Sequence, residues 1–140
     1  KTWESDKVTI QTDFSSNKTV FNADILVTDW SDIACEYAFT TERPVLYVDT
    51  PMKVMNPDYQ DIQEVPVNIA IREKIGRRLK VEEMDKVCDL VTDMLQNKDA
   101  YKERIRNEYD EFCFNHGEAA KSGTTYIINS LKRIQMHETK

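Results

Sequence analysis

The sequence predicts an α/β fold in which a small parallel sheet is flanked by helices and followed by a helical C-terminal tail. Two short apolar runs, Ile25–Val27 and Val45–Val48, have the length and composition of strands that are buried on both faces. The amphipathic segment Asp32–Phe39 lies between them, so the order strand, helix, strand predicts a right-handed parallel crossover. The last third of the chain carries apolar residues at helical spacing.

Further elements are expected on either side of this unit. Lys7–Asp13 alternates β-branched and polar residues, which predicts a first short strand, and a brief helix is expected to end near Asn22. Val67–Ile71 is interpreted as an edge strand, and the basic segment Arg72–Lys80 is expected to turn at Gly76. The remaining pattern predicts helices over residues 81–95, 101–112 and 120–134.

The segment from Asp49 to Pro66 has no regular period. Prolines and short polar residues are frequent in it, which predicts a long irregular loop. A loop of this length in a compact domain is more often functional than accidental.

Length and composition limit the architecture. We interpret the 140 residues as a single domain, 1–140. No apolar run approaches the ~20 residues that span a bilayer, and the first residues lack the apolar region of a signal peptide. Because the chain begins with Lys1 rather than Met, we interpret it as a piece of a longer protein.

Charge, cysteine count and motif content argue against several function classes. The net charge of −6 argues against a nucleic-acid partner that depends on phosphate neutralisation. The three cysteines are widely spaced, as in a cytosolic protein with reduced thiols, and the two histidines are too few for a metal site. No dinucleotide-binding glycine motif and no P-loop is present, so no cofactor is expected.

The most informative stretch is the polar turn between the first buried strand and the following helix, which contains Thr28, Asp29, Ser31 and Asp32. Ligands of open parallel sheets collect where strands end and helices begin. The free N–H groups of the first helical turn and the Ser31 hydroxyl would suit an anion. The Asp32 carboxylate would compete for the same donors, and the alternative is that Ser31 and Asp32 only cap the helix.

Two neighbouring features are weaker candidates. Glu36 lies one helical turn after Asp32 and would accept hydrogen bonds from sugar hydroxyls, or it is simply an exposed helix residue. In the segment 115–123, His116 beside Gly117 would donate to a phosphate or act as a base, although a lone loop histidine is more often solvated. Gly123 inside the following helix suggests close approach by a neighbouring helix or a ligand, since glycine lowers helix stability.

A local excess of positive charge follows the long loop. This basic run would face a phosphate or an anionic membrane surface, or it forms a solvated helix face. Its candidate residues are Arg72, Arg77 and Arg78.

The segment Ala23–Ser31, ADILVTDWS, resembles a motif of the CDP-glycerol glycerophosphotransferase family, the teichoic-acid polymerases and their relatives. Glu36-Tyr37 and Arg43–Tyr47 continue the similarity, which is strongest over residues 23–51. The tail Asn115–Ala120, NHGEAA, is similar to the closing segment of the family. One departure concerns the turn, because Asp32 stands where the family has a second serine.

The resemblance implies the C-terminal, nucleotide-binding half of a GT-B transferase, which is built from two Rossmann-like halves. Ser31 and the helix end beside it would hold the pyrophosphate of a CDP-activated alcohol, and Glu36 would face the nucleotide. Asn115 and Gly117 would close the site. The implied reaction is attack by an acceptor hydroxyl of a cell-envelope polymer on the β-phosphate, with release of CMP.

The resemblance also concerns partners and location. The family's catalytic histidines belong to motifs upstream of this chain, so no catalytic residue is expected in the fragment apart from His116 as a candidate. The missing N-terminal half is an expected partner, and the full-length protein would be cytoplasmic and peripheral at the inner face of the membrane.

Two alternatives stay open. The first is a GT-B glycosyltransferase domain that uses a nucleotide-sugar. The second is a non-catalytic α/β interaction module of the receiver type, for which acidic residues follow three expected strands at Asp13, Asp29 and Asp49. No lysine stands at a matching strand end, as a receiver domain would require.

Overall fold

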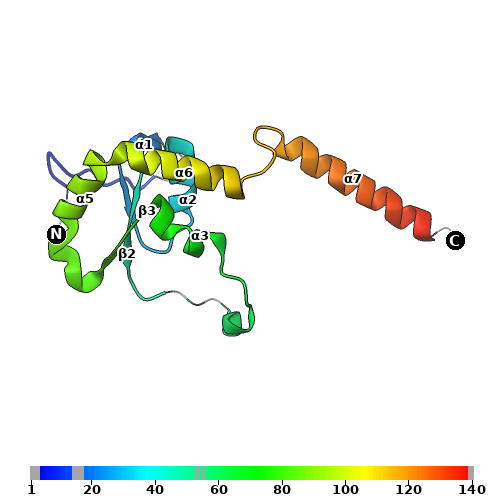
Figure 1. The fold of residues 1–140 in the computed structure, drawn as a ribbon, viewed down its shortest axis with the longest axis horizontal. Helices are drawn as coiled ribbons and strands as arrows, with labels where there is room; N and C mark the ends of the chain where they lie inside the picture. Colours follow the sequence, from blue (N-terminus) through cyan, green and yellow to red (C-terminus); the bar gives the residue numbers. More distant parts are fainter. Residues whose placement is uncertain (1–3, 14–17, 53, 55, 139–140) are drawn as a thin grey trace.

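The computed structural model describes residues 4–13, 18–52, 54 and 56–138. A three-stranded sheet with its covering helices forms the body, and the last helix, α7 (Ala119–Glu138), extends away from it (Figure 1).

The sheet consists of β1 (Leu26–Thr28), β2 (Val45–Asp49) and β3 (Gly76–Lys80), in the order β1-β2-β3. Both pairs are parallel, and the register places Val45 opposite Leu26 on one side and opposite Gly76 on the other. The predicted α/β class, the parallel crossover and the helical tail are therefore confirmed. Since the strands are parallel, their carboxyl ends lie at one edge of the sheet.

Helices and short 3-10 turns fill the connections. The first crossover contains α2 (Ile33–Thr41), and the second contains the long loop, α3 (Val67–Ala70) and α4 (Arg72–Ile75). The other elements are α1 (Lys18–Asn22), η1 (Tyr59–Asp61), η2 (Val81–Lys86), α5 (Val87–Gln96) and α6 (Lys98–Phe112).

The core lies between the sheet and its helices. β2 is the central strand, and Val45, Leu46 and Tyr47 are buried in it. The Tyr37 hydroxyl on α2 donates to the carbonyl of Ala23 at 2.8 Å, and burial raises the pKa of this phenol, which keeps it a donor. This contact ties α2 to the chain that leads into β1. Further core side chains come from α2, α3 to β3, α5 and α6: Ala34, Ala38, Ile71, Ile75, Leu79, Met94, Tyr101 and Ile105.

Glu42 joins the end of α2 to α6. It adopts the left-handed conformation with φ 57° at the C-cap of α2. Its carboxylate accepts from Arg106 Nε at 2.7 Å and pairs with Lys102 Nζ at 3.1 Å. These hydrogen bonds, that of Arg106 first, hold the pKa of Glu42 below its usual range.

Two of the predicted strands are wrong. The strand expected over Lys7–Asp13 is absent from the described residues, where only an isolated antiparallel bridge joins Ser5 to Val8. The edge strand expected over Val67–Ile71 is helix α3, followed directly by α4. The physical reason is spacing, because Ile71 and Ile75 lie four residues apart, one helical turn, and both are fully buried.

Gly76 is the first residue of β3 rather than the turn that the sequence predicts. A Cβ atom added there would overlap the backbone carbonyl of Val45 on β2. Gly123, by contrast, has nothing near its Cβ position, so the described structure supplies no neighbour that explains it. Glycine is therefore required at position 76, where β3 approaches β2 closely, and not at position 123.

We expect Gly76→Ala to lower the free energy of unfolding by about 1–3 kcal/mol, because overpacking would push β3 away from β2. Gly123→Ala is the matched control, since it adds the same methyl group in open space on α7. It is expected to raise helicity and leave the unfolding midpoint of the body unchanged. Urea denaturation followed by circular dichroism measures both, and equal midpoints for the two variants would contradict the close approach.

Candidate functional site

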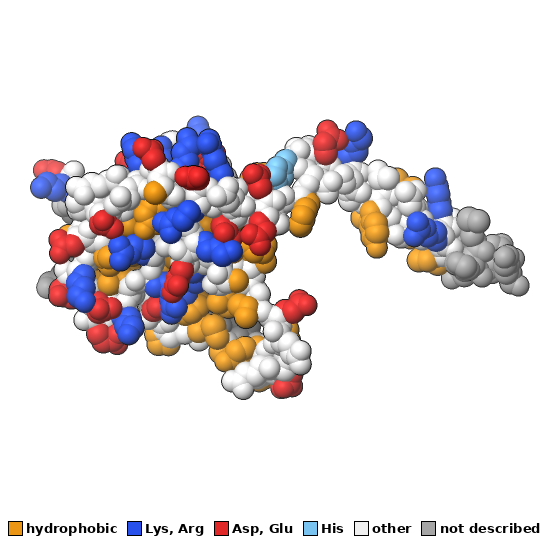
Figure 2. Space-filling model, in the orientation of Figure 1, with side chains coloured by type: hydrophobic (Ala, Val, Ile, Leu, Met, Phe, Trp, Pro, Cys, Tyr) orange, Lys and Arg blue, Asp and Glu red, His pale blue; other side chains and the backbone are white. Residues whose placement is uncertain are grey.

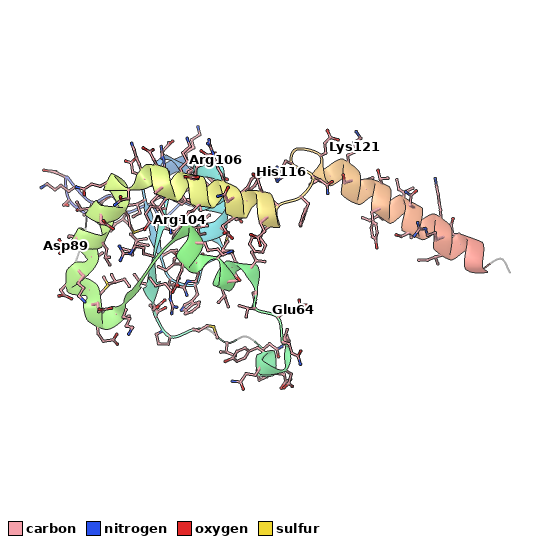
Figure 3. The ribbon with its side chains drawn as sticks, in the orientation of Figure 1. Glu64, Asp89, Arg104, Arg106, His116 and Lys121 are labelled. Carbon is pink, nitrogen blue, oxygen red and sulfur yellow. The ribbon has the colours of Figure 1, made fainter. Side chains whose placement is uncertain are left out.

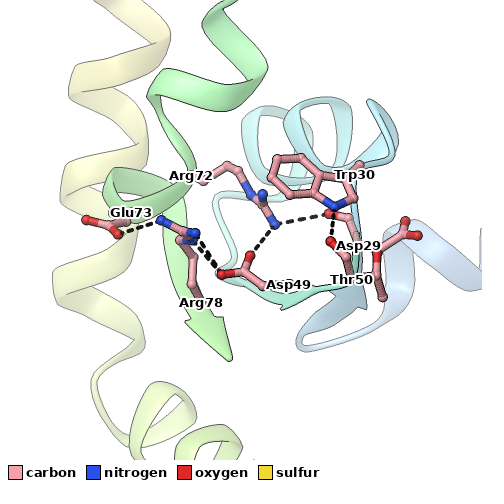
Figure 4. A network of polar contacts seen from close by, with 7 residues as sticks. All are labelled: Asp29, Trp30, Asp49, Thr50, Arg72, Glu73 and Arg78. Atoms are coloured by element: carbon pink, nitrogen blue, oxygen red, sulfur yellow. Dashed lines mark hydrogen bonds and ion pairs between the residues drawn. The ribbon is translucent and has the colours of Figure 1, made fainter. Parts of the chain in front are cut away.

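The candidate site lies at the carboxyl edge of the sheet. β1 ends at Thr28 and is followed by the turn that leads into α2, and β2 ends at Asp49. Arg72, the first residue of α4, reaches the same edge from the second crossover (Figure 4). Segments that are far apart in the sequence therefore meet here.

Arg72 is the centre of the cluster, and its side chain is only 4% exposed. Its Nη2 donates to Asp49 Oδ1 at 3.2 Å and to the backbone carbonyl of Asp29 at 3.3 Å. The guanidinium carbon lies 3.9 Å from the ring centroid of Trp30 and 4.5 Å from that of Tyr47. Burial lowers the pKa of Arg72, and the Asp49 carboxylate opposes that shift.

Asp49 connects this buried cation to a second arginine. Its Oδ2 atom accepts from Arg78 Nε at 2.9 Å and contacts Arg78 Nη2 at 2.8 Å, which raises the pKa of Arg78. Arg78 Nη1 also contacts Glu73 Oε1 at 3.4 Å. The result is an alternating row of two arginines and two carboxylates (Figure 4).

The turn after β1 is fixed from the other side by Trp30. Its indole Nε1 donates to the carbonyl of Thr50, just past the end of β2, at 2.7 Å. Together with the contact of Arg72 to the Asp29 carbonyl, this bond holds the backbone on both sides of the turn. The exposed Ser31 therefore has a fixed position beside the start of α2.

The N-terminus of α2 has no side-chain cap in the structure. The Asp32 carboxylate instead accepts from Asn68 Nδ2 at 2.5 Å, so it is tied to α3 rather than bound to the helix end. Expected capping by Ser31 or Asp32 side chains is thus wrong, and its physical reason is the competing amide of Asn68. In the described part of the chain, no side chain accepts from the first N–H groups of α2, and those of Ala34 and Cys35 donate to the backbone carbonyls of Ser31 and Asp32 at 3.3 and 3.1 Å.

Two hollows adjoin this turn. The wider one has a volume of about 310 Å³ and is lined by Trp30, Ile69, Ala70, Arg72, Glu73 and Arg78. The narrower one, about 10 Å³, reaches Ser31, Tyr47 and Asn68, and it has room for about one water molecule. Tyr47 Oη and Arg72 Nε are buried without a hydrogen-bond partner in the described part of the chain, and both residues line this small hollow.

Burial raises the pKa of Tyr47 strongly, so its hydroxyl keeps its proton. Tyr47 Oη–H and Arg72 Nε–H are therefore two buried donors that belong to residues lining the small hollow. A water molecule or an anionic or hydroxylic ligand atom would satisfy them.

The structure gathers only some of the predicted site residues. Thr28, Asp29, Ser31 and Asp32 form the turn, and Arg72 and Arg78 lie beside it. Glu36 is exposed in the first turn of α2. Arg77 is directed elsewhere, because its Nη1 pairs with Asp93 on α5 at 2.9 Å.

The predicted residues near the C-terminus form a separate turn between α6 and α7 (Figure 3). Asn115 and Gly117 adopt positive φ angles of 55° and 74°. His116 stacks on Tyr109 with 4.4 Å between ring centroids, and its Nε2 donates to the Cys113 carbonyl at 2.6 Å. No interaction within the described residues links this turn to Ser31.

Sequence reasoning missed the residues that hold the cluster together: Trp30, Tyr47, Asn68 and Glu73. The place of Asp49 at the site could have been predicted, because Asp49 is the last residue of a buried strand that runs parallel to the strand ending before Asp29. Asn68 had no such signal, since its segment was interpreted as a strand.

Other chemistries lack support in the described part of the chain. No group of three or more metal-ligating side chains is found there. Burial, with the nearby Asp32, raises the pKa of the Cys35 thiol, which disfavours a thiolate nucleophile. None of the described helices has the length and apolar character needed to cross a bilayer.

We expect Asp49→Asn to lower the free energy of unfolding by about 3 kcal/mol, because it leaves the buried Arg72 cation without its carboxylate. Asp93→Asn is the matched control, since it breaks the exposed pair with Arg77 and is expected to cost about 0.5 kcal/mol. Urea titrations of both variants at pH 7 give the comparison. Similar losses would show that Arg72 does not depend on Asp49.

Comparison with curated proteins and with solved structures gives no match. The family model of CDP-glycerol:poly(glycerophosphate) glycerophosphotransferase matches residues 3–129, which include all three strands and the turn at Ser31. This match covers most of the 140 residues, and the chain belongs to the CDP-glycerol:poly(glycerophosphate) glycerophosphotransferase family.

Proposed function

We propose that this chain is the donor-binding domain of a transferase that moves an alcohol phosphate from a CDP-linked alcohol to a cell-envelope polymer. Membership of a glycerophosphotransferase family supports a nucleotide-linked donor. The observation that carries the proposal is the start of α2, which lies uncapped at the carboxyl edge of a parallel sheet with the exposed Ser31 beside it.

The donor pyrophosphate would bind at this helix end. N–H groups in the first turn of α2 and the Ser31 hydroxyl supply hydrogen bonds, and the helix dipole favours the negative charge. Asp32 is held by Asn68, which keeps its carboxylate off those donors. Arg78 is half exposed at 46% and adds positive charge next to the turn.

The nucleoside would lie beyond the phosphates. Glu36 is exposed on the first turn of α2, where its carboxylate would accept hydrogen bonds from the ribose hydroxyls. Thr28 and Asp29 form the start of the same turn. Asn115, His116 and Gly117 are candidates on the family resemblance alone, and the positive φ angles of Asn115 and Gly117 show only that their turn is tight.

In the proposed reaction, the oxygen of an acceptor hydroxyl attacks the β-phosphorus of the CDP-alcohol. The bond between that phosphorus and the bridging oxygen breaks, and CMP leaves. A base takes the acceptor proton, and donors at the start of α2 stabilise the charge that develops on the phosphate oxygens. We place that base in an N-terminal half that would complete a GT-B cleft, so the 140-residue chain is expected to be inactive alone.

The cellular setting belongs to the same proposal. A polymer acceptor in the cell envelope would require the full-length enzyme to work in the cytoplasm at the inner membrane face. Arg77 is about half exposed and would contribute to a peripheral contact with anionic lipid, while the buried Arg72 would not.

Calorimetric titration with CDP, UDP and CMP tests the donor site. We expect CDP to bind about tenfold more tightly than CMP, because one more phosphate reaches the helix end, and more tightly than UDP. Ser31→Ala is expected to remove most of the advantage of CDP over CMP, while Ser130→Ala on α7 leaves it intact. A preference for UDP would favour a nucleotide-sugar transferase, and no binding of any nucleotide would contradict a donor site.

A further inference from the structure

Two contacts define how α2 and α6, which lie side by side, are paired (Figure 1). Glu42, at the C-cap of α2, accepts from Arg106 Nε at 2.7 Å. Phe39 lies three residues earlier in the chain, and its ring meets that of Tyr109 with 5.5 Å between centroids. Tyr109 lies three residues later than Arg106. Because the contacts move towards the start of α2 as they move towards the end of α6, the two helices run antiparallel.

The next position in this series is occupied by two cysteines. Cys35 lies four residues before Phe39 on α2. Cys113 lies four residues after Tyr109, at the C-cap of α6. Residues three or four positions apart share one face of a helix, so each cysteine continues the face that carries the aromatic ring. Antiparallel pairing therefore places the side chains of Cys35 and Cys113 opposite each other.

The spacing of the two helices suits a covalent bridge. Cα atoms of α2 and α6 approach to within 8 Å of one another. Packed helices have their axes about 8–10 Å apart, and each Cα atom lies about 2.3 Å from its axis. Directly facing Cα atoms therefore come within about 5 Å, and a disulfide requires about 4.4–6.8 Å between them.

Two further observations place the sulfur atom of Cys113 near Cys35. His116 Nε2 bonds to the Cys113 carbonyl at 2.6 Å while its ring stacks on Tyr109, which holds the chain at Cys113 against α6. Burial raises the pKa of the Cys35 thiol, and the negative charges of Asp32 and of a Cys113 thiolate add to that rise. Such repulsion between partly buried groups is felt only at short distance.

Both sulfur atoms are available for chemistry. Cys35 and Cys113 are free thiols, and both are partly exposed. Figure 2 shows the segment that leads from the body to α7 at the surface, and this segment is exposed directly after Cys113. A small oxidant therefore reaches Cys113 from solvent.

We propose that Cys35 and Cys113 form a reversible disulfide that fastens the first turn of α2 to the end of α6 when the chain meets a low-molecular-weight disulfide such as oxidised glutathione. The Cys113 thiolate attacks one sulfur atom of the oxidant, and one reduced thiol leaves. Cys35 then gives its proton to solvent, attacks the Cys113 sulfur of the mixed disulfide and displaces the second reduced thiol. Two protein thiols are oxidised, and one small disulfide is reduced to two thiols.

The cross-link acts on the start of α2, because Asp32 and Glu36 flank Cys35 in that turn. A reducing compartment keeps both thiols free, whereas oxidation restricts movement of the turn relative to α6. This inference does not depend on the proposed nucleotide site.

Peptide mapping of the folded 140-residue chain tests the bridge. After equilibration with oxidised and reduced glutathione at about pH 8 and alkylation of free thiols, we expect a non-reduced peptide pair that contains Cys35 and Cys113. Dithiothreitol should release the two peptides. Cys88→Ser is the matched control, because Cys88 is exposed on α5 and its loss should leave the pair intact, while Cys35→Ser should abolish it.

Thermal unfolding measures the fastening of the two helices. The oxidised chain should melt about 10 °C higher than the reduced chain, because the bridge closes a long loop, and Cys113→Ser should show no such difference. An unchanged midpoint in the bridged chain would contradict the fastening. The proposal is overturned if Cys35 and Cys113 carry only glutathione adducts, if either pairs with Cys88, or if they pair only in concentrated urea, where α2 and α6 no longer pack together.

Discussion

The Asp49 carboxylate holds together the polar cluster at the carboxyl edge of the sheet, because it accepts from Arg72 with one oxygen and from Arg78 with the other. Arg72 is a buried cation between the rings of Trp30 and Tyr47, and such a charge is stable only with a carboxylate and further acceptors in reach. The same guanidinium donates to the carbonyl of Asp29. One interaction at the end of β2 thus fixes the first crossover relative to the second, and with it the position of the turn that contains Ser31.

The sequence predicted those parts of the fold that depend on local pattern. β2, α2 and the C-terminal helices follow from apolar runs and helical spacing, and the turn at Ser31 follows from their order. The segment from Val67 to Ile75 did not, because a β-branched stretch was weighed above the four-residue spacing of Ile71 and Ile75. The prediction of a strand over Lys7–Asp13 was wrong because an alternating sequence forms a strand only where a neighbouring strand is available to pair with it.

The candidate site was predictable in place but not in its supporting residues. The turn residues Thr28 to Asp32 were recognisable from the sequence, whereas Asn68 and Glu73 join them only through the second crossover. The amide of Asn68 also determines which donor the Asp32 carboxylate binds. A carboxylate at the start of a helix often accepts from the first N–H groups, and here it accepts from the Asn68 amide instead.

The most direct measurement of the central idea is the change in backbone amide chemical shifts when CDP is added to the isotope-labelled chain. We expect the largest changes at Asp32 and Ile33, at the start of α2, with smaller changes at Trp30 and Arg72. Cytidine without phosphate should leave these amides unchanged. Changes confined to other segments, or an equal response to cytidine, would contradict a phosphate site at the uncapped end of α2.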